Sequence, residues 1–485
     1  MISTSLRVLL TSLTMVTGLL SAPVTAAAAA PVSCAPPVPS TTQPGYTVAD
    51  PHCDIGTSTP FAPLTDPAGR VLSTVYAAIV DGAAYRIEVP RRWNGDLVIY
   101  AHGYRGTGRT VWVDSPSLRA FYIRQGFAWA ASSYQTNGYD VGQGVRDSHA
   151  MIAQFRRTVG HRPDDVFMTG VSMGGHITAV AIEHFPEAFD GAMPACGVLG
   201  DAKLFDYFLD ANVTAAALTG TPITFPLQPP ADYAAVYGQQ VAAELPLLGS
   251  GLGSGSTPVF TPLGRQWEAT VEQRSGGTRP GFDGAFAFWN AASSGPPLTG
   301  APFLFGLYPG LSGGTIGIAN GNVTSNVRTV YQLDGDPRLS ADERRLNAAV
   351  LRVRSTASPS RHLSGVPAVQ GRPRIPVLSL HGLGDLFVPF SMEQEYGRRA
   401  AAAGRSRLFV SRAIRSVGHC DFTPAEMQRG FTDLVRWVHT GHRPAGDDIL
   451  NPAQVAEPTF GCRFTDGAHA FFLGTPCPAR RGADM

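Results

Sequence analysis

The chain has 485 residues, a formal net charge of +1 and a charged fraction of 15%. That fraction is well below the roughly 25% of an average soluble domain, and the near-zero net charge points to no nucleic-acid or anionic-membrane partner. Glycine (54 residues) and proline (39 residues) make up about a fifth of the chain, less than the roughly 25–30% typical of disorder. We therefore expect a globular protein that is rich in loops.

Residues 1–30 have the pattern of a secretory signal peptide. Arg7 precedes a mostly apolar run that ends at Leu20, and Ala26 to Ala30 offers small residues for cleavage. A membrane span needs about 20 unbroken apolar residues, whereas threonine, serine and glycine interrupt this run. The sequence therefore predicts a secreted protein without a membrane span.

All six cysteines lie beyond the predicted cleavage site, and an even number in an exported chain predicts disulfides. Six cysteines allow 15 pairings. Nearness in sequence favours Cys34 with Cys53 and Cys462 with Cys477, which leaves Cys196 for Cys420. The alternative is that the cysteines are buried free thiols.

The first part of the chain holds short strand patterns and two helical patterns. After a leader rich in proline and serine (residues 31–66), turn signals separate three strand-like runs at 71–80, 84–89 and 96–102. A helical pattern at 115–125, an apolar run at 127–132 and a helical pattern at 144–159 follow. From residue 127 onward, apolar strands alternate with helices.

The alternation continues through two further strands, within 164–172 and 186–198, and resumes at residue 374. There a strand (374–385), a helix (391–404), a strand (406–414) and a helix (424–441) follow one another. Continuous apolar strands alternating with helices indicate an α/β fold with a mostly parallel sheet and helices on both faces. We assign residues 67–200 and 373–440 to this core.

Residues 201–372 interrupt the alternation with a segment rich in glycine, proline and aromatic residues. A structureless loop of this length is improbable in a compact domain. We therefore expect an inserted cap domain that is partly helical, at 231–245 and 341–354. The tail, residues 441–485, carries the last two cysteines and is expected to be attached to the surface.

Gly170-Val171-Ser172-Met173-Gly174 matches GxSxG, with the strand before it and the helix after it that this motif requires. The turn is too sharp for a Cβ at either glycine position. The sequence therefore predicts Ser172 as a nucleophile rather than a residue of an ordinary turn. A serine hydroxyl needs a neighbouring base to become reactive.

His419 is the predicted base among twelve histidines, because it lies in the loop between the last strand and the last helix, where parallel sheets collect their sites. His176, one helical turn after Ser172, is expected to pack on the sheet. Asp385 ends a strand 34 residues before His419 and is the predicted carboxylate that orients it. Asp201, which follows the preceding strand, is the rival for this role.

The chain order Ser172, Asp385, His419 is that of the α/β-hydrolase superfamily. The sequence resembles that superfamily at "YAHGYRG", "GVSMGG", "HGLGD" and "GHCDF", over about residues 71–440 apart from the insert. The resemblance implies an α/β-hydrolase fold with a large inserted cap between the sixth and seventh strands. It also implies an oxyanion hole formed by the N–H groups of Met173 and Tyr104, with Gly103 as an alternative to Tyr104.

Cys420 directly follows His419, which looks like the arrangement in tannases and feruloyl esterases, where a cystine ties the histidine loop to the serine turn. In those enzymes the partner cysteine immediately precedes the serine, whereas Val171 stands there in this chain. Cys196, at the end of the next strand, is the residue that can take a similar tethering part.

We expect a secreted carboxylesterase that forms an acyl-Ser172 intermediate and acts on a small ester, with an apolar or aromatic group favoured by the aromatic residues of the insert. An amide or peptide hydrolase on the same triad is the first alternative, and a non-catalytic binding protein is the second. Lys203 is the single lysine of the chain, which argues against Ser/Lys or Schiff-base chemistry. The sequence has no HExxH, paired CxxC or phosphate-loop motif, so we expect neither a metal nor an organic cofactor.

Overall fold

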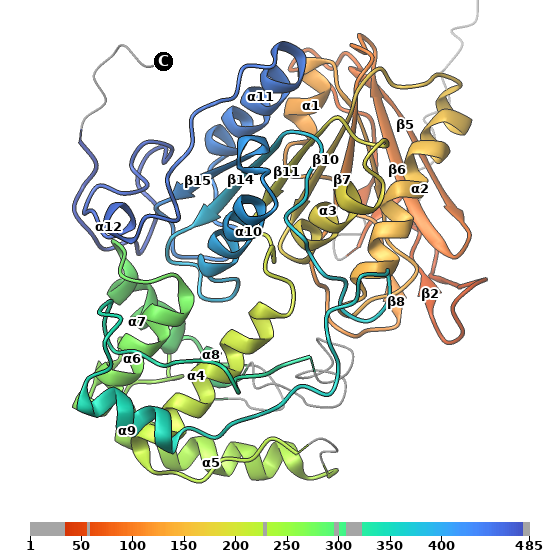
Figure 1. Ribbon diagram of the computed structural model, residues 1–485. Helices are drawn as coiled ribbons and strands as arrows, with labels where there is room; N and C mark the ends of the chain where they lie inside the picture. The colour runs from red at the N-terminus through yellow and green to blue at the C-terminus, as the bar shows by residue number, and fades with distance from the viewer. Residues whose placement is uncertain (1–33, 56–58, 227–229, 295–299, 307–322, 479–485) are drawn as a thin grey trace, which may run out of the picture. The chain divides into compact units, whose positions relative to one another are not determined.

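A computed structural model describes residues 34–55, 59–226, 230–294, 300–306 and 323–478 (Figure 1). The predicted signal peptide, residues 1–30, lies outside the described residues. The core is an eight-stranded sheet. In sequence order its strands are β5 (Ser73–Val80), β6 (Ala83–Pro90), β7 (Leu97–Ala101), β9 (Ala128–Ser132), β10 (Val166–Val171), β11 (Gly191–Ala195), β14 (Val377–Gly382) and β15 (Phe409–Ile414).

The order of strands across the sheet is β5-β6-β9-β7-β10-β11-β14-β15. Strand β6 runs antiparallel to both of its neighbours, and the pairings from β9 to β15 are all parallel. The carboxyl ends of the parallel strands therefore meet at one edge, where functional sites of such sheets collect. The α/β fold with a mostly parallel sheet, predicted from the alternating pattern, is confirmed.

Helices cover both faces of the sheet (Figure 1). One face carries α2 (Val141–Val159), α3 (Met173–His184) and α10 (Ser391–Ala402), and the other carries α1 (Arg119–Gln125) and α11 (Pro424–Thr440). Because successive side chains of a strand point to opposite faces, Ile99 and Met168 join the hydrophobic cluster under α2 and α3, whereas Val98 and Phe167 join the cluster under α1 and α11. Each strand thus contributes to two cores.

Local capping residues determine where several helices begin and end. Helix α2 begins at Val141, three residues before the predicted start, because the side chain of Asp140 accepts a hydrogen bond from the Gln143 N–H. Helix α11 begins with a capping box in which Thr423 and Glu426 each accept from the other's main-chain N–H. Helix α1 begins four residues later than predicted, after a turn in which the Arg119 N–H donates to Pro116 O.

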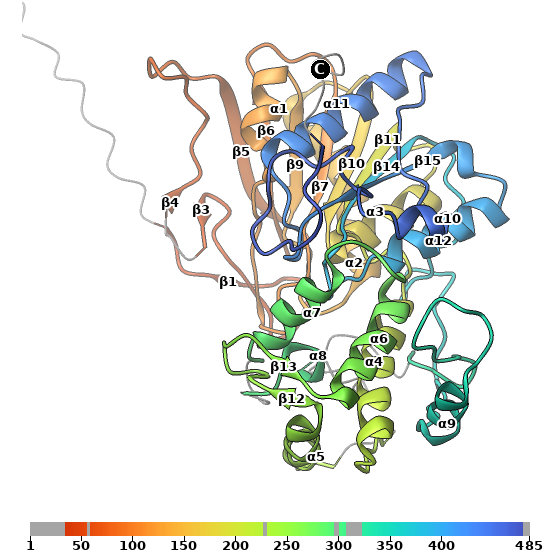
Figure 2. The same cartoon turned by 90° about the vertical axis from the view of Figure 1, so that its left-hand side faces the viewer.

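The helices of the insert (residues 201–372) lie beyond the carboxyl edge of the sheet in both ribbon views (Figures 1 and 2), and residues 363–372 run back along α2 and α3. Two of its helices match the predicted ones, α5 (Tyr233–Leu248) and α9 (Ala341–Ala349). The sequence did not predict α4 (Lys203–Thr219), α6 (Pro262–Ser275), α7 (Phe282–Ala291) or α8 (Phe303–Gly306). Residues 204–216 of α4 are all buried, so this helix has no polar stripe by which its period could be recognised.

The remaining short elements lie at the edges of the core and in the insert. They are β1 (Val38–Pro39), β2 (Thr47–Val48), β3 (Cys53–Asp54), β4 (Thr59–Pro60), β8 (Thr110–Val111), β12 (Gly249–Ser250), β13 (Val259–Phe260), the 3-10 helix η2 (Ser406–Leu408) and α12 (Pro452–Val455). Among the described residues, no helix is long and apolar enough to cross a membrane.

Three disulfides join all six cysteines in the pairing that sequence proximity favoured: Cys34–Cys53, Cys196–Cys420 and Cys462–Cys477. The prediction of disulfides is confirmed, and the alternative of free thiols is wrong. Paired cysteines are typical of proteins that fold in an oxidising compartment.

The tail is held to the core by a buried histidine between two carboxylates. His469 Nε2 lies 3.0 Å from Glu426 Oε1, and His469 Nδ1 lies 3.2 Å from Asp421 Oδ2. The side chain of His469 is only 3% exposed. The hydrogen bond to Glu426 raises the pKa of His469 above its usual value, although burial opposes the shift.

We predict that attachment of the tail weakens as the pH rises. A histidine whose pKa is raised by folding contributes stability that is fully present below its unfolded pKa, about 6.5, and is lost as the pH rises through its folded pKa. Limited proteolysis of the segment after Arg463 should therefore accelerate as the pH rises above about 6.5. The His469→Gln variant should lose this pH dependence, and His439→Gln, a change at a half-exposed histidine, should retain it. Equal pH profiles for wild type and His469→Gln would contradict the assignment.

Candidate active site

Ser172 lies at the tip of the turn between β10 and α3, with a φ of 56° and a ψ of −124°. A positive φ at a non-glycine residue costs on the order of 1–3 kcal/mol, so the surroundings must hold it in place. The Ser172 N–H donates to Ala195 O at 3.1 Å, and Ser172 O accepts from the N–H groups of Gly175 (2.9 Å) and Val198 (3.3 Å). The turn is thereby attached to the end of β11.

The glycines of this turn are required by close packing of the main chain. A Cβ at Gly170 would overlap the carbonyl of Gly174, and a Cβ at Gly174 would overlap the carbonyl of Ala101 in β7. Both contacts are with main-chain atoms, which cannot move aside as a flexible side chain can. The residues 170–174, called the elbow below, therefore have the local structure that the GxSxG pattern predicts.

The structure brings Ser172, His419 and Asp385 together. His419 Nε2 lies 2.8 Å from Ser172 Oγ, and His419 Nδ1 lies 2.7 Å from Asp385 Oδ2. Asp385 is fully buried, and its Oδ1 accepts from the N–H groups of Phe387 (2.9 Å) and Val388 (3.0 Å). Because a carboxylate can only accept, His419 Nδ1 carries the proton, and its Nε2 is free to accept the proton of the Ser172 hydroxyl. This arrangement can activate a serine for attack on a carbonyl carbon.

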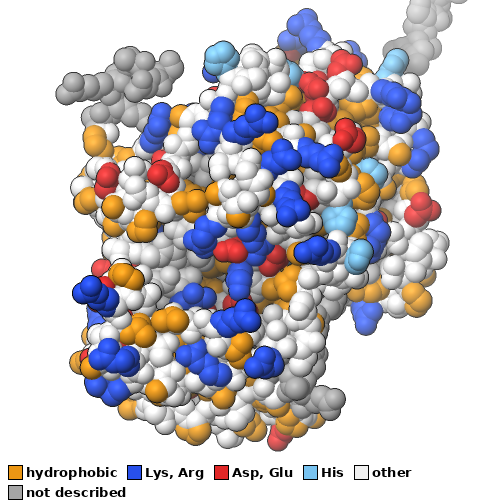
Figure 3. Space-filling model, in the orientation of Figure 1, with side chains coloured by type: hydrophobic (Ala, Val, Ile, Leu, Met, Phe, Trp, Pro, Cys, Tyr) orange, Lys and Arg blue, Asp and Glu red, His pale blue; other side chains and the backbone are white. Residues whose placement is uncertain are grey.

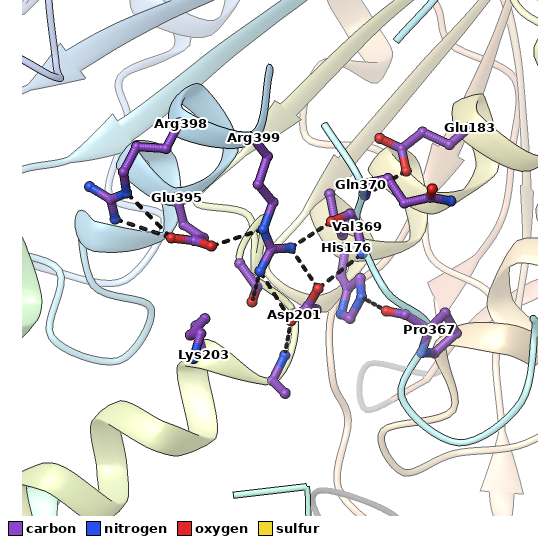
Figure 4. Close-up of polar contacts among 12 residues, drawn as sticks. His176, Glu183, Asp201, Lys203, Pro367, Val369, Gln370, Glu395, Arg398 and Arg399 are labelled. Atoms are coloured by element: carbon purple, nitrogen blue, oxygen red, sulfur yellow. Dashed lines mark hydrogen bonds and ion pairs between the residues drawn. The ribbon is translucent and has the colours of Figure 1, made fainter. Parts of the chain in front are cut away.

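Asp201, the rival to Asp385, lies in a different cluster (Figure 4). Its Oδ2 accepts from Arg399 Nη1 at 2.6 Å and from the Val369 N–H at 3.0 Å. Asp201 therefore joins α10 to the end of the insert and does not contact His419. Asp421, two residues after His419, contacts His469 in the tail.

Other histidines near the carboxyl edge of the sheet are buried and already hydrogen-bonded. Burial lowers the pKa of His176 to about 4 and lowers the pKa of His102 well below its usual value, so both rings stay neutral. These two rings and that of His381 lie against main-chain carbonyls: His176 Nε2 is 2.7 Å from Pro367 O, His102 Nε2 is 3.2 Å from Ser133 O, and His381 Nε2 is 2.7 Å from Val388 O. None of the three contacts Ser172 Oγ in the described part of the chain.

The two expected oxyanion donors lie beside the elbow. Met173 is the first residue of α3, and the first N–H groups of a helix have no partner within the helix. Gly103 lies so close to the elbow that a Cβ there would be 3.1 Å from Ser172 Cβ and 3.6 Å from Ser172 Oγ. Tyr104, the next residue, is half-buried at the same loop. The geometry thus places both main-chain segments next to the serine hydroxyl.

Several known proteins are similar to this chain. The chain is similar to the o-phthalyl amidase of Xanthobacter agilis, with 24% identity over 438 residues that cover 78% of this chain and 90% of that protein. No protein-family model matches. Two solved structures are also similar: the tannin acyl hydrolase of Aspergillus niger (14% identity, 77% and 79% coverage of this chain and of that one, TM-score 0.43) and feruloyl esterase B of Aspergillus oryzae (15% identity, 78% and 83% coverage, TM-score 0.38). Both TM-scores lie below 0.5, so we assign the fold from the strand order and the elbow and not from these two structures.

The elbow between β10 and α3, the mostly parallel sheet and the chain order of Ser172, Asp385 and His419 occur together in one superfamily. The protein has the α/β-hydrolase fold. The insert enters this hydrolase between β11 and β14, the sixth and seventh strands of the sheet, as the resemblance implied.

The Cys196–Cys420 disulfide joins the His419 loop to the end of β11, beside the elbow. Cys420 directly follows His419, and Cys196 directly follows Ala195, whose carbonyl binds the Ser172 N–H. The Cys196 N–H also donates to Leu380 O in β14, the strand that precedes Asp385. The disulfide thus lies at the junction of the three segments that carry the triad.

Aromatic side chains from the core and the insert surround one side of His419. The Phe387 ring packs edge-on at 4.9 Å from the His419 ring, and Phe303 packs 5.4 Å from Phe387. Trp289 and Phe288 continue this aromatic cluster, at 4.5 Å from Phe303 and 5.6 Å from Trp289 respectively. Phe387, Phe303 and Phe288 are half-buried, so part of each ring remains accessible. The sequence analysis missed Phe387, although its place two residues after Asp385 could have indicated it.

Trp289, on α7 of the insert, contacts both the Asp385 loop and the His419 loop through one N–H group. Its Nε1 donates to Gly384 O at 2.9 Å and to Val417 O at 3.0 Å. Gly384 immediately precedes Asp385, and Val417 lies two residues before His419. A buried indole N–H that is shared between these carbonyls fixes the spacing of the two loops.

Two groups of residues among those described have side chains close enough together to hold a metal ion. Cys196 and Cys420 of the first group form a disulfide, and its third member, His419, contacts Ser172 and Asp385. Asp96, Asp165 and His439 of the second group form ion pairs at the opposite edge of the sheet, before β7 and β10. Neither group therefore indicates a metal ion at the serine site.

We predict that Trp289→Phe lowers kcat on the order of tenfold or more while KM changes little. The phenylalanine keeps an aromatic ring, but loss of the N–H leaves two carbonyls unpaired. The Asp385 and His419 loops are then free to shift, and small misplacements of catalytic groups lower kcat strongly. The matched control is Trp267→Phe, because Trp267 Nε1 donates to Ala211 O inside the insert, away from the triad. Steady-state kinetics of the two variants should differ. Equal losses of kcat would show that Trp289 acts only through the stability of the insert.

Proposed function

We propose that the hydrolase is a serine carboxylesterase that cleaves small esters through an acyl-Ser172 intermediate. The observation that carries this proposal is the pair of contacts made by His419, 2.8 Å to Ser172 Oγ and 2.7 Å to Asp385 Oδ2. His419 Nε2 takes the hydroxyl proton as Ser172 Oγ forms a bond to the carbonyl carbon, and Asp385 stabilises the resulting imidazolium. The same proton then passes to the departing alcohol, and a water molecule activated by His419 releases the acid.

The negative oxygen of the tetrahedral intermediate needs donors that are already in place. We assign this role to the N–H groups of Met173 and Tyr104, with Gly103 as the alternative to Tyr104. Their support is the position of Met173 at the start of α3 and the close approach of Gly103 to Ser172. Removing one such donor typically costs about 10²–10³ in turnover.

The acyl group is proposed to be apolar or aromatic. The accessible rings of Phe387, Phe303 and Phe288 form the aromatic cluster beside His419, and two of the three belong to the insert. Aromatic groups pack favourably against such rings. We therefore assign residues 201–372 the role of a cap that roofs Ser172 and forms part of the substrate pocket.

Amide hydrolysis is the second candidate, favoured by the similarity to an o-phthalyl amidase over most of both chains. The phthalyl group in that name is aromatic, and an aromatic group would pack favourably against the rings beside His419. Amide cleavage uses the same triad but needs His419 to protonate a poorer leaving group. An enzyme that cleaves an amide is therefore expected to cleave the ester of the same acid as well.

The hydrolase is proposed to act outside the cell. Three disulfides support folding in an oxidising compartment, and residues 1–30 have the pattern of a signal peptide. The near-neutral net charge agrees with a small-molecule substrate and no nucleic-acid partner.

We predict that a fluorophosphonate probe labels the wild-type protein once and leaves Ser172→Ala unlabelled. Turnover of p-nitrophenyl esters should fall on the order of 10⁴-fold or more in Ser172→Ala and about 10⁴-fold in Asp385→Asn, because the latter holds the wrong tautomer of His419. Asp201→Asn is the matched control and should retain the wild-type rate on these esters.

The same panel distinguishes the candidates. Turnover of p-nitroanilides as well as of esters would favour the amidase, and turnover of esters alone would favour the carboxylesterase. No labelling and no turnover of either class would favour a non-catalytic binding protein, and near-wild-type activity of His419→Ala would remove His419 as the base.

A further inference from the structure

A cleft of about 1220 Å³ opens between α10 of the core and the insert, apart from the serine site. It is lined by residues at the start of α4, at the start of α10, and in the insert segments 323–330 and 354–359. Figure 3 shows a hollow at the centre of this face, with basic and acidic side chains around it. The lining includes none of Ser172, Asp385 and His419.

The cleft has a positive excess that the chain as a whole lacks. The whole chain has 38 basic and 37 acidic residues, whereas the described lining has six basic and three acidic ones. The basic residues are Lys203, Arg274, Arg328, Arg354, Arg398 and Arg399, and the acidic ones are Asp201, Asp206 and Glu395. Charged residues are about a third of this lining but only 15% of the chain, so the cleft is a local concentration of charge.

All three acids are already paired with basic groups, and two of them, Asp201 and Asp206, are nearly buried. Arg399 binds Asp201 at 2.6 Å and Glu395 at 2.9 Å (Figure 4), and Lys203 Nζ binds Asp206 at 2.8 Å. The side chains of Asp201 and Asp206 are 4% and 7% exposed, whereas that of Lys203 is 52% exposed. What solvent and a ligand meet in the cleft is therefore mainly the cationic ends.

The same ion pairs hold the cationic groups in position before any ligand arrives. The Arg399 guanidinium is fixed by Asp201, Glu395 and the Val369 carbonyl, at 2.5 Å from the last of these. Arg398 is held by Glu395 at 3.2 Å and is 55% exposed. Arginines that are oriented in this way lose little conformational freedom when they bind a carboxylate or phosphate group.

We propose that this cleft binds a small organic anion that carries two or more carboxylate or phosphate groups. Arginine guanidinium groups bind both kinds of oxyanion with paired hydrogen bonds, and the volume is sufficient for a ligand of several such groups. Arg398 binds from the core side, and Lys203, Arg328 and Arg354 bind from the insert. The site is independent of the acyl chemistry proposed for Ser172, and it would join the insert to the core when occupied.

Isothermal titration calorimetry of the full chain tests the proposal, with citrate as the polycarboxylate, fructose 1,6-bisphosphate as the phosphate ester and fructose as the neutral control. We expect saturable binding of at least one of the two anions, none of fructose, and weaker binding as salt is added. The Arg328→Gln/Arg354→Gln variant should weaken binding about tenfold or more, because two charge-assisted contacts are lost. Whichever of the two anions binds shows whether the cleft accepts carboxylate or phosphate groups.

The matched control is Arg91→Gln/Arg92→Gln, which makes the same change of net charge at exposed positions far from the cleft and should leave binding unchanged. Melting temperatures of both variants verify that they fold. Absence of saturable binding of both anions, or equal binding by the two variants, would overturn the proposal.

Lys203 allows a second test on the wild-type chain. It is the single lysine of the protein, so acetylation followed by peptide mapping reports on this cleft alone. The anion that binds should slow acetylation of Lys203 about tenfold or more at saturation, because it covers the amine, and it should not slow modification of the α-amino group. Unchanged acetylation of Lys203 would contradict the proposed location. Both tests remain informative whether or not Ser172 acts as a nucleophile.

Discussion

Ser172 has a positive φ because the main chain must turn from β10 into α3 within a single residue. The turn is possible only because Gly170 and Gly174 have no side chains. The carbonyls of Gly174 and Ala101 occupy the space that a Cβ at these two positions would need. Such a conformation persists when its surroundings supply enough hydrogen bonds, and here they come from the end of β11 through Ala195 and Val198. The hydroxyl is thereby presented at the carboxyl edge of the sheet, where loops from other strands can reach it.

The partners of Ser172 come from segments far apart in the chain, and three devices hold them together. The Cys196–Cys420 disulfide attaches the His419 loop to the end of β11. Trp289 connects the loops of Asp385 and His419 through one indole N–H, so the insert takes part in the geometry of the triad as well as in the pocket. Asp201 and Arg399 attach the end of the insert to α10. The insert is thus joined to the core both beside the serine site and at the basic cleft.

Much of the core could be predicted because its signals are local. The glycines around Ser172, the continuous apolar strands and the places of Asp385 and His419 after strands are all visible within a few residues. The insert was harder to predict, since α4 is buried on all sides and shows no amphipathic period. The roles of Phe387 and Trp289 were missed because they depend on contacts between segments that only the folded chain brings together. Asp201 and Asp385 both follow strands, and only the folded chain shows that Asp385 contacts His419 whereas Asp201 contacts Arg399.

We propose that Ser172, activated by His419, forms a covalent acyl intermediate. Rapid acid quench of the protein with a p-nitrophenyl ester of an aromatic acid, followed by mass spectrometry, tests this directly. We expect a burst of one equivalent of p-nitrophenol and a mass increase of one acyl group on the peptide that contains Ser172. Turnover without an adduct on that peptide, or an adduct on another residue, would contradict it.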